Sequence, residues 1–249
     1  MIKAIIFDKD GTLIQFHEFW ISVAEKVLYD IINKYKIHKN ISKKIFPAIG
    51  IQGNKLIPDG IFAAKTSFDL AKTWFEILQI PDLTLNEFFS IITTLFEKYS
   101  HQQKNNIRLF PGIKNVIIKL KDMHYTLAVI TNDNLASTLQ TLELTGIKPY
   151  IDFLGTDNGE IPAKPNPGWG KKFCDEFDLT PGQVIMVGDT PIDMQFGKNC
   201  GFYTIGVLNG VSDNENLQPD ADEIIPSATD IFQTEILQLE NTRPARQTN

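Results

Sequence analysis

The sequence has little cysteine and no long hydrophobic run. Its two cysteines, Cys174 and Cys200, are too few for a disulfide framework and lack the spacing of metal ligands, so we interpret them as free thiols in a reducing compartment. No stretch approaches the roughly 20 apolar residues that a membrane span needs. The N-terminus leads straight into an apolar strand, without the pattern of a signal peptide. These absences predict a cytoplasmic protein with no membrane partner.

Positive charge is also scarce. The 24 lysines and arginines are outnumbered by 30 aspartates and glutamates, and the formal net charge is −6. A nucleic-acid partner normally requires a basic face, so we expect none. The arginines are Arg108, Arg243 and Arg246, and none lies in residues 15–107. That segment therefore lacks the bidentate side chain that usually binds a carboxylate or a phosphate.

Apolar runs alternate with helical patterns along most of the chain. Short apolar runs are typical of strands that are buried on both faces of a parallel sheet, and they occur at residues 4–7, 125–130, 184–187 and 203–207. Amphipathic helical patterns separate these runs. The alternation predicts an α/β fold, a Rossmann-like parallel-sheet core with helices on both faces.

A long helical segment interrupts this alternation directly after the first strand. Residues 15–107 show helical periodicity and no convincing strand, which predicts an inserted α-helical domain. The core domain would then consist of residues 1–14 and 108–239. The polar residues 240–249 are expected to form a disordered tail.

The first strand is followed at once by Asp8, Lys9, Asp10, Gly11 and Thr12. If the extended geometry continues past the strand, Asp8 and Asp10 point the same way and Lys9 points away from both, with no catalytic role. Gly11 allows the backbone to turn tightly and approach a ligand. Two neighbouring carboxylates repel each other unless a cation or a shared proton lies between them, so this stretch predicts a metal site.

Other polar side chains follow the later strands. Thr131 and Asn132 come after one predicted strand, and Asp189 and Asp193 follow another. Lys164 lies on a segment that two prolines make stiff and extended. In open parallel sheets, ligands bind outside the carboxyl ends of the strands. We therefore expect these residues and the first motif to meet in one crevice.

The chemistry of this set favours phosphoryl transfer. Asp8, Asp10 and Asp189 would supply hard oxygen ligands, which suit Mg²⁺. The Thr, Asn and Lys side chains are donors, and the backbone amides of Gly11 and Thr12 add more, as a phosphoryl group requires. One carboxylate can attack phosphorus while the second transfers protons as general acid and base.

Four motifs in this order resemble those of the haloacid-dehalogenase-superfamily phosphatases, particularly the phosphoglycolate-phosphatase-like branch. They are Asp8-Lys9-Asp10-Gly11-Thr12, Thr131-Asn132, Lys164-Pro165 and Gly188-Asp189-Thr190-Pro191-Ile192-Asp193. The resemblance extends over about residues 1–230. It implies that the inserted helical domain is a cap, which closes over the substrate and excludes water.

The resemblance also implies roles for these residues. Asp8 would be the nucleophile, and Asp10 the acid/base residue that also offers its backbone carbonyl to Mg²⁺. Thr131 and Lys164 would hold the phosphoryl group, with Asn132 beside them.

The metal site implied by the resemblance is formed by Asp8, Asp10, Asp189 and Asp193. Asp189 would be a direct ligand, and Asp193 would support the site directly or through water. Lys9 replaces the apolar residue that most members carry between the two aspartates.

We therefore predict a Mg²⁺-dependent phosphatase that hydrolyses a small phosphorylated metabolite through an aspartyl-phosphate on Asp8. The substrate would be phosphoglycolate-like or a sugar phosphate, and the enzyme a monomer or a homodimer. The alternatives are a phosphomutase of the same fold, similar to β-phosphoglucomutase, and a non-catalytic phospho-ligand-binding protein. A cap without arginine argues against phosphoglycolate itself and against a mutase, which must hold two phosphate positions in turn.

Candidate substrate contacts in the cap are few. Trp20 and Phe16 follow the first motif closely and are the aromatic side chains expected to reach the substrate. Lys55 and Lys65 are the candidate cations.

Overall fold

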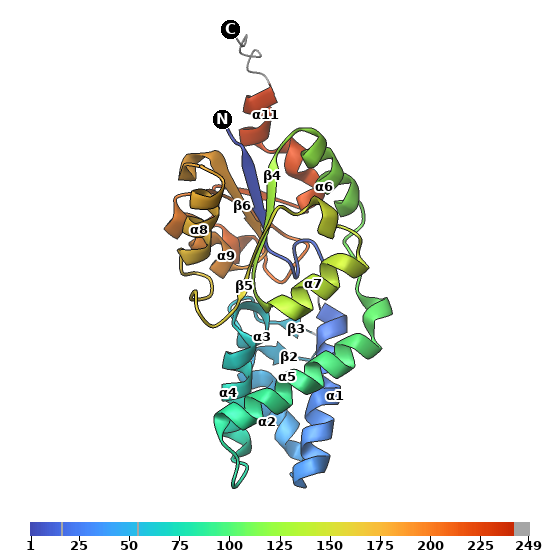
Figure 1. Cartoon of the computed structure of the whole chain (residues 1–249). Coiled ribbons are helices and arrows are strands. Elements are labelled where there is room, and N and C mark those ends of the chain that lie inside the picture. Colours follow the sequence, from blue (N-terminus) through green and yellow to red (C-terminus); the bar gives the residue numbers. More distant parts are fainter. Residues whose placement is uncertain (16, 54, 242–249) are drawn as a thin grey trace.

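The protein is described by a computed structural model, which covers residues 1–15, 17–53 and 55–241. Its centre is a six-stranded sheet with the order β5-β4-β1-β6-β7-β8, in which every pair of neighbours is parallel (Figure 1). The strands are β1 (Ala4–Phe7), β4 (Thr126–Asn134), β5 (Phe153–Asp157), β6 (Val184–Gly188), β7 (Tyr203–Val207) and β8 (Glu223–Ile225). The predicted fold class is confirmed.

Helices cover both faces of this sheet (Figure 1). They are α6 (Ile113–Asp122), α7 (Leu135–Leu144), α8 (Gly168–Glu176), α9 (Pro191–Cys200), α10 (Asn214–Leu217) and α11 (Glu235–Asn241), with short 3₁₀ turns η3 (Lys148–Tyr150), η4 (Pro181–Gln183) and η5 (Ala228–Gln233). Alternate residues of β1 enter opposite cores. Ile5 and Phe7 pack with α6, and Ala4 and Ile6 pack with α8 and α9. Burial on both faces explains why β1 is apolar throughout.

Residues 15–107 form a helical unit with a hydrophobic core of its own, built around side chains such as Trp74 and Phe88. Its helices are α1 (His17–Tyr35), α2 (Ser42–Ala48), α3 (Ile61–Ala64), α4 (Ser67–Leu78) and α5 (Leu85–Gln102), with 3₁₀ turns η1 (Lys39–Ile41) and η2 (Lys104–Asn106). The segment that leaves the sheet domain lies beside the segment that returns to it. Two hydrogen bonds join them: Gln15 N–H donates to Arg108 O at 2.9 Å, and Phe110 N–H donates to Leu13 O at 3.0 Å. The domain boundaries themselves stay a prediction.

One expectation for this unit was wrong. A short antiparallel hairpin, β2 (Ile51–Gln52) with β3 (Lys55–Leu56), lies where no strand was expected. Strands of two residues are too short to show an alternating pattern. Between residues 61 and 78 the helical periodicity is divided between α3 and α4, because Thr66 caps α4 through a capping box with Asp69.

The C-terminal part also differs from expectation. The helix α11 extends to Asn241, so the first two residues of the predicted tail, 240 and 241, are helical. Its apolar residue Leu237 is buried in the core of the sheet domain. The rest of the tail, residues 242–249, lies outside the described residues. Cys174 and Cys200 are free thiols, as predicted. Within the described part of the chain, no helix is both long and apolar enough to span a membrane.

Candidate active site

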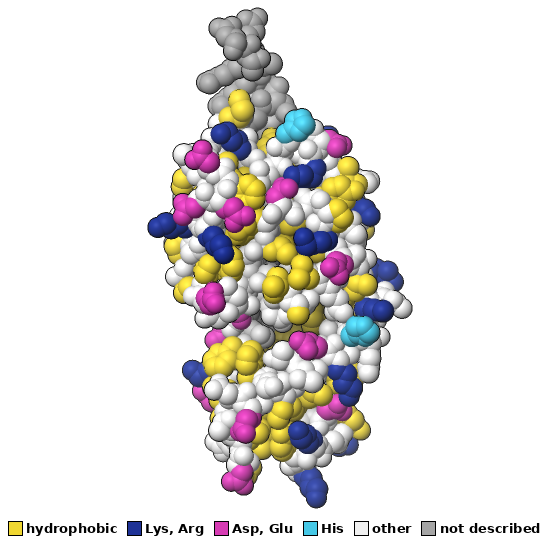
Figure 2. Space-filling view, viewed as in Figure 1, with side chains coloured by type: hydrophobic (Ala, Val, Ile, Leu, Met, Phe, Trp, Pro, Cys, Tyr) yellow, Lys and Arg dark blue, Asp and Glu magenta, His cyan; other side chains and the backbone are white. Residues whose placement is uncertain are grey.

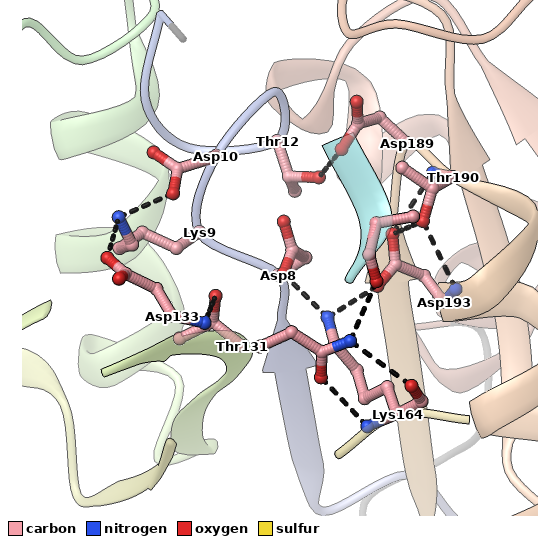
Figure 3. A network of polar contacts seen from close by, with 12 residues as sticks. Asp8, Lys9, Asp10, Thr12, Thr131, Asp133, Lys164, Asp189, Thr190 and Asp193 are labelled. Carbon is pink, nitrogen blue, oxygen red and sulfur yellow. Dashed lines mark hydrogen bonds and ion pairs between the residues drawn. The ribbon is translucent and has the colours of Figure 1, made fainter. Parts of the chain in front are cut away.

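The first motif turns away from the sheet as soon as β1 ends. Gly11 has a φ of +82°, and Leu13 and Ile14 N–H both donate to Lys9 O at 3.0 Å. Asp8 N–H still donates to Val187 O of β6 at 2.8 Å, but the extended geometry ends there, and the expectation that Asp8 and Asp10 point the same way was wrong. Figure 3 shows Asp8 directed toward Lys164, whereas the Asp10 carboxylate turns toward Lys9.

Lys9 is fully buried and contacts two carboxylates. Its Nζ atom lies 2.5 Å from Asp10 Oδ2 and 3.0 Å from Asp133 Oδ2 (Figure 3), and it lies 5.8 Å from the centre of the Trp20 ring. Burial opposes the charge of Lys9, but the two carboxylates outweigh it and raise the pKa of the ammonium group. The expectation that Lys9 points away from Asp10 was wrong, because the tight turn replaces the strand alternation on which it depended.

Replacing Lys9 with methionine should cost stability, because two buried carboxylates would lose their cation. We expect Lys9→Met to lower the free energy of unfolding by about 3–5 kcal/mol in urea denaturation. Lys198→Met is the matched control, since Lys198 forms an ion pair with Asp222 in which both side chains are about a third exposed or more, and its loss should cost about 1 kcal/mol or less. Equal losses in the two variants would contradict the structural role of Lys9.

Three buried carboxylates meet at the carboxyl end of the sheet. Oxygens of Asp8, Asp189 and Asp193 lie within 4.8 Å of one another. Asp189 fits closely between two glycines, since a Cβ atom at Gly11 or Gly210 would lie 2.2 or 2.0 Å from Asp189 Oδ2. A divalent cation fits this donor set, because hard oxygen ligands in a buried cluster are what Mg²⁺ prefers. The Asp10 side chain does not belong to this cluster.

The charges of the cluster are unfavourable without a cation. Burial raises the pKa of Asp8 to about 7, and the neighbouring Asp193 and Asp10 act in the same direction, whereas Lys164 opposes the shift. Burial also raises the pKa of Asp189 well above its usual range, with further contributions from Asp193 and Asp8. Both aspartates thus resist ionisation together, as expected of carboxylates that share a metal.

Lys164 is the cation of this site. Its Nζ atom donates to Asp8 Oδ1 at 2.6 Å and to Asp193 Oδ1 at 2.5 Å (Figure 3). Asp193 is held in turn by Thr190, whose hydroxyl donates to Asp193 Oδ2 at 2.6 Å in the capping box of α9. Burial opposes the charge of Lys164, but Asp193 and Asp8 outweigh it and raise its pKa. Helix capping and ion pairing therefore fix the same carboxylate.

Thr12 contacts the cluster through Asp189. Its hydroxyl is fully buried and donates to Asp189 Oδ1 at 3.1 Å, while Val211 N–H donates to Asp189 Oδ2 at 2.9 Å. The Thr12 side chain thus orients a carboxylate. Thr131 is different, because its hydroxyl oxygen accepts from Asp133 N–H at 3.2 Å and its side chain lines the cavity described below.

Asn132 links the end of α3 to the loop that carries Lys164. Its Nδ2 group donates to Ala64 O at 2.8 Å and to Lys164 O at 3.1 Å, and its Oδ1 atom accepts from Lys164 N–H at 2.8 Å. Both amide hydrogens are therefore given to backbone carbonyls. The side chain positions Lys164 against the end of α3, whereas the sequence predicted a donor that faces the substrate.

A cavity of about 460 Å³ lies between the sheet domain and the helical unit, at the waist visible in Figure 2. The sheet domain lines it with Asp8, Asp10, Thr131, Asn132, Lys164 and Asp193, among other residues. Gly11, Thr12 and Asp189 do not line it. Of the cap candidates, Trp20 and Lys65 line the cavity, Lys55 does not, and Phe16 lies outside the described residues.

Sequence reasoning missed several residues of this site. Lys9 between two aspartates signalled an ion pair, but the partner Asp133 could be found only once the first turn and the end of β4 were brought together. Thr190 carried a clear signal, since Thr190 and Asp193 have the spacing of a capping box. The contact between Asn132 and Ala64 O involves a backbone atom and had no sequence signal.

Comparisons with known proteins agree with this geometry. The family described as "Haloacid dehalogenase-like hydrolase" matches residues 5–207. The "Phosphoglycolate phosphatase" of Haemophilus influenzae is 27% identical over 216 residues, which are 85% of this chain and 88% of the relative. The "Probable phosphatase IndB" of Dickeya dadantii is 27% identical over 228 residues, 90% of this chain and 89% of the relative.

Solved structures share the fold. A crystal structure of "a predicted phosphoglycolate phosphatase" from Haemophilus somnus 129PT has a TM-score of 0.71 at 23% identity, covering 93% of this chain and 97% of that one. The β-phosphoglucomutase of Clostridium difficile has a TM-score of 0.69 at 18% identity, covering 96% and 97%. The chain belongs to the haloacid dehalogenase-like hydrolases, and the prediction of a phosphoric monoester hydrolase is confirmed.

Proposed function

We propose that this enzyme is a Mg²⁺-dependent phosphatase that hydrolyses a small phosphomonoester through an aspartyl-phosphate on Asp8. The observation that carries the proposal is the position of Asp8, a buried carboxylate that lines the cavity, is held by Lys164 and adjoins Asp189 and Asp193. In this proposal residues 15–107 are the cap, and residues 1–14 and 108–239 are the core domain.

The chemistry would proceed in two displacements. An oxygen of Asp8 attacks phosphorus, the ester P–O bond breaks with its electron pair going to the leaving oxygen, and Asp10 supplies the proton. Water then attacks the aspartyl-phosphate and gives a proton to Asp10, and the bond to Asp8 breaks, which releases phosphate. Burial raises the pKa of Asp10, although Lys9 opposes the shift, and this favours the protonated form that the first step needs.

Other residues would bind the transferred group. Lys164 and the Thr131 hydroxyl are the donors that line the cavity beside Asp8. We propose that Asp8, Asp189 and Asp193 hold Mg²⁺, together with the backbone carbonyl of Asp10. The ion supplies positive charge that lowers the repulsion between the carboxylates and an anionic phosphate.

Phosphate release from a generic aryl phosphate should require Mg²⁺ and stop on addition of EDTA. Binding of Mg²⁺ should also stabilise the protein, and it should raise the Tm more at pH 8 than at pH 5. Since folding raises the pKa of Asp8 from 3.8 to about 7, the unfolded chain loses this proton first, and the metal-free protein loses stability as the pH rises through that interval. At pH 5 protons compete with the metal for the same oxygens, which weakens binding and its stabilising effect. Phosphate assays and thermal denaturation measure both effects.

Asp189→Asn is the informative variant for this experiment, because it removes a proposed ligand and leaves the nucleophile in place. Its Tm should respond little to Mg²⁺ at pH 8. An equal Tm for the wild-type protein with and without Mg²⁺ at pH 8, together with activity in EDTA, would contradict the metal site.

A further inference from the structure

The part of the cavity that would receive the leaving group is mostly apolar. On α5, Ile92, Thr93, Phe96, Glu97, Ser100 and His101 line the cavity. Their spacing follows one face of a helix, so α5 forms a continuous wall. Two residues of this wall, Ile92 and Phe96, are apolar, and they lie in its N-terminal half. Leu70 of α4 and Trp20 of α1 add two further apolar side chains.

Aromatic packing holds this wall in place. The Phe96 ring contacts two tryptophans, with its centre 6.4 Å from that of Trp20 and 6.3 Å from that of Trp74. Trp74 and Ile92 are almost completely buried in the core of the helical unit. A surface supported in this way does not rearrange readily to accommodate a charged group.

The cavity offers little to a second anion. Among the described residues that line it, the basic side chains are Lys65, His101 and Lys164, and none is an arginine. Lys164 already contacts Asp8 and Asp193, and Glu97 of the wall carries a negative charge. A substrate carboxylate or second phosphate placed against α5 would lose its water without a bidentate partner, which is costly.

The volume is also larger than a two-carbon substrate needs. Cavities from about 300 Å³ upward hold drug-sized ligands in which apolar surface supplies much of the contact. A phosphoryl group placed at Asp8 would leave the space beside Phe96 and Leu70 for the rest of the ester.

We propose that the preferred substrate is the phosphomonoester of an uncharged alcohol with an apolar body about the size of one ring, which packs against Phe96 and Trp20. This inference rests on the proposed phosphatase function and specifies its substrate class. The phosphoryl end binds at Asp8 and Lys164, and the apolar body is covered by the cap. An acidic two-carbon ester such as phosphoglycolate fills neither the volume nor the apolar wall.

The test compares esters of alcohols with similar intrinsic reactivity. With Mg²⁺ present, kcat/KM for 2-phenylethyl phosphate should exceed that for ethyl phosphate and for phosphoglycolate by about 50-fold, the effect of burying one aromatic ring. Phe96→Ala should reduce the ratio of phenylethyl to ethyl phosphate about tenfold. The milder Phe96→Leu should reduce it less, and it covers the case in which the alanine variant does not fold.

Phe68→Ala is the matched control. Phe68 also belongs to the helical unit and contacts another aromatic ring, but it is 37% exposed and does not line the cavity, so the variant should keep the wild-type ratio. A wild-type preference for phosphoglycolate or ethyl phosphate would overturn the inference. So would a ratio that Phe96→Ala and Phe68→Ala change equally.

Binding separates failure of this inference from failure of the proposed function. The non-hydrolysable 2-phenylethylphosphonate should bind more tightly than ethylphosphonate in calorimetry, whether or not the esters are turned over. Tighter binding without hydrolysis of any ester would support the apolar site and reject the phosphatase. Hydrolysis with no preference for the aromatic ligand would support the phosphatase and reject the apolar site.

Discussion

Asp8→Asn is expected to lower kcat by at least about 10³-fold, because asparagine keeps the shape of the side chain but cannot serve as the attacking carboxylate. Acid-quenched wild-type enzyme mixed with substrate should carry one phosphoryl group on the peptide that contains Asp8. The variant should carry none. Mass spectrometry of the quenched protein and steady-state phosphate release measure the two effects.

The same substitution should not destabilise the metal-free protein at pH 8. Because burial raises the pKa of Asp8 to about 7, its ionised form costs more in the folded protein than in the unfolded chain at this pH. Removing the charge relieves that cost, so the Tm should equal or exceed the wild-type value. Asp122→Asn, on the exposed end of α6, is the control and should change neither activity nor Tm. Full activity in Asp8→Asn would reject the covalent mechanism.

Lys164→Met is expected to impair both activity and stability. Loss of the ammonium group leaves Asp8 and Asp193 as buried carboxylates without their cation, which should cost about 3–5 kcal/mol of unfolding free energy in EDTA. The phosphoryl group also loses a preorganised donor, which should reduce kcat by about 10²–10³-fold. Urea denaturation and steady-state kinetics measure the two losses.

Two further variants make this prediction specific. Lys164→Arg keeps the positive charge and should recover part of the stability, but the different shape of guanidinium should leave kcat low. Lys171→Met removes an exposed lysine of α8 and should behave as wild type. Mg²⁺ should partly restore the stability of Lys164→Met, because the metal neutralises the same carboxylates. A variant as stable in EDTA as the wild-type protein would contradict the structural role of Lys164.

The sheet and its strand ends were predictable because their signals are local. A strand buried on both faces must be apolar, so Ala4–Phe7 could be recognised from four residues. Strand ends in a parallel sheet meet at one edge, so Asp8, Thr131 and Asp189 could be placed in one crevice without coordinates. Amphipathic periodicity predicted the helices that separate these strands.

Contacts inside the site were less predictable. Strand alternation predicted that Lys9 would point away from Asp10, but a glycine turn begins one residue after β1 and reverses that conclusion. The side-chain amide of Asn132 was predicted to donate to the substrate, because it follows a strand and a phosphoryl group requires donors. In the structure a backbone carbonyl at Ala64 takes that donor, and a carbonyl has no residue-specific signature in sequence.

The sequence by itself determined the sheet and the class of reaction, because apolar runs identify buried strands and the polar side chains that follow them indicate the chemistry. Tertiary structure alone decided how the two aspartates of the first motif are separated: Asp8 joins the buried carboxylate cluster with Asp189 and Asp193, and Asp10 pairs with Lys9. It also decided the character of the cavity, since Trp20 and Phe96 come together only where α1 and α5 pack against each other, beyond the carboxyl ends of the strands (Figure 1). Side chains distant in sequence form such a surface only through folding.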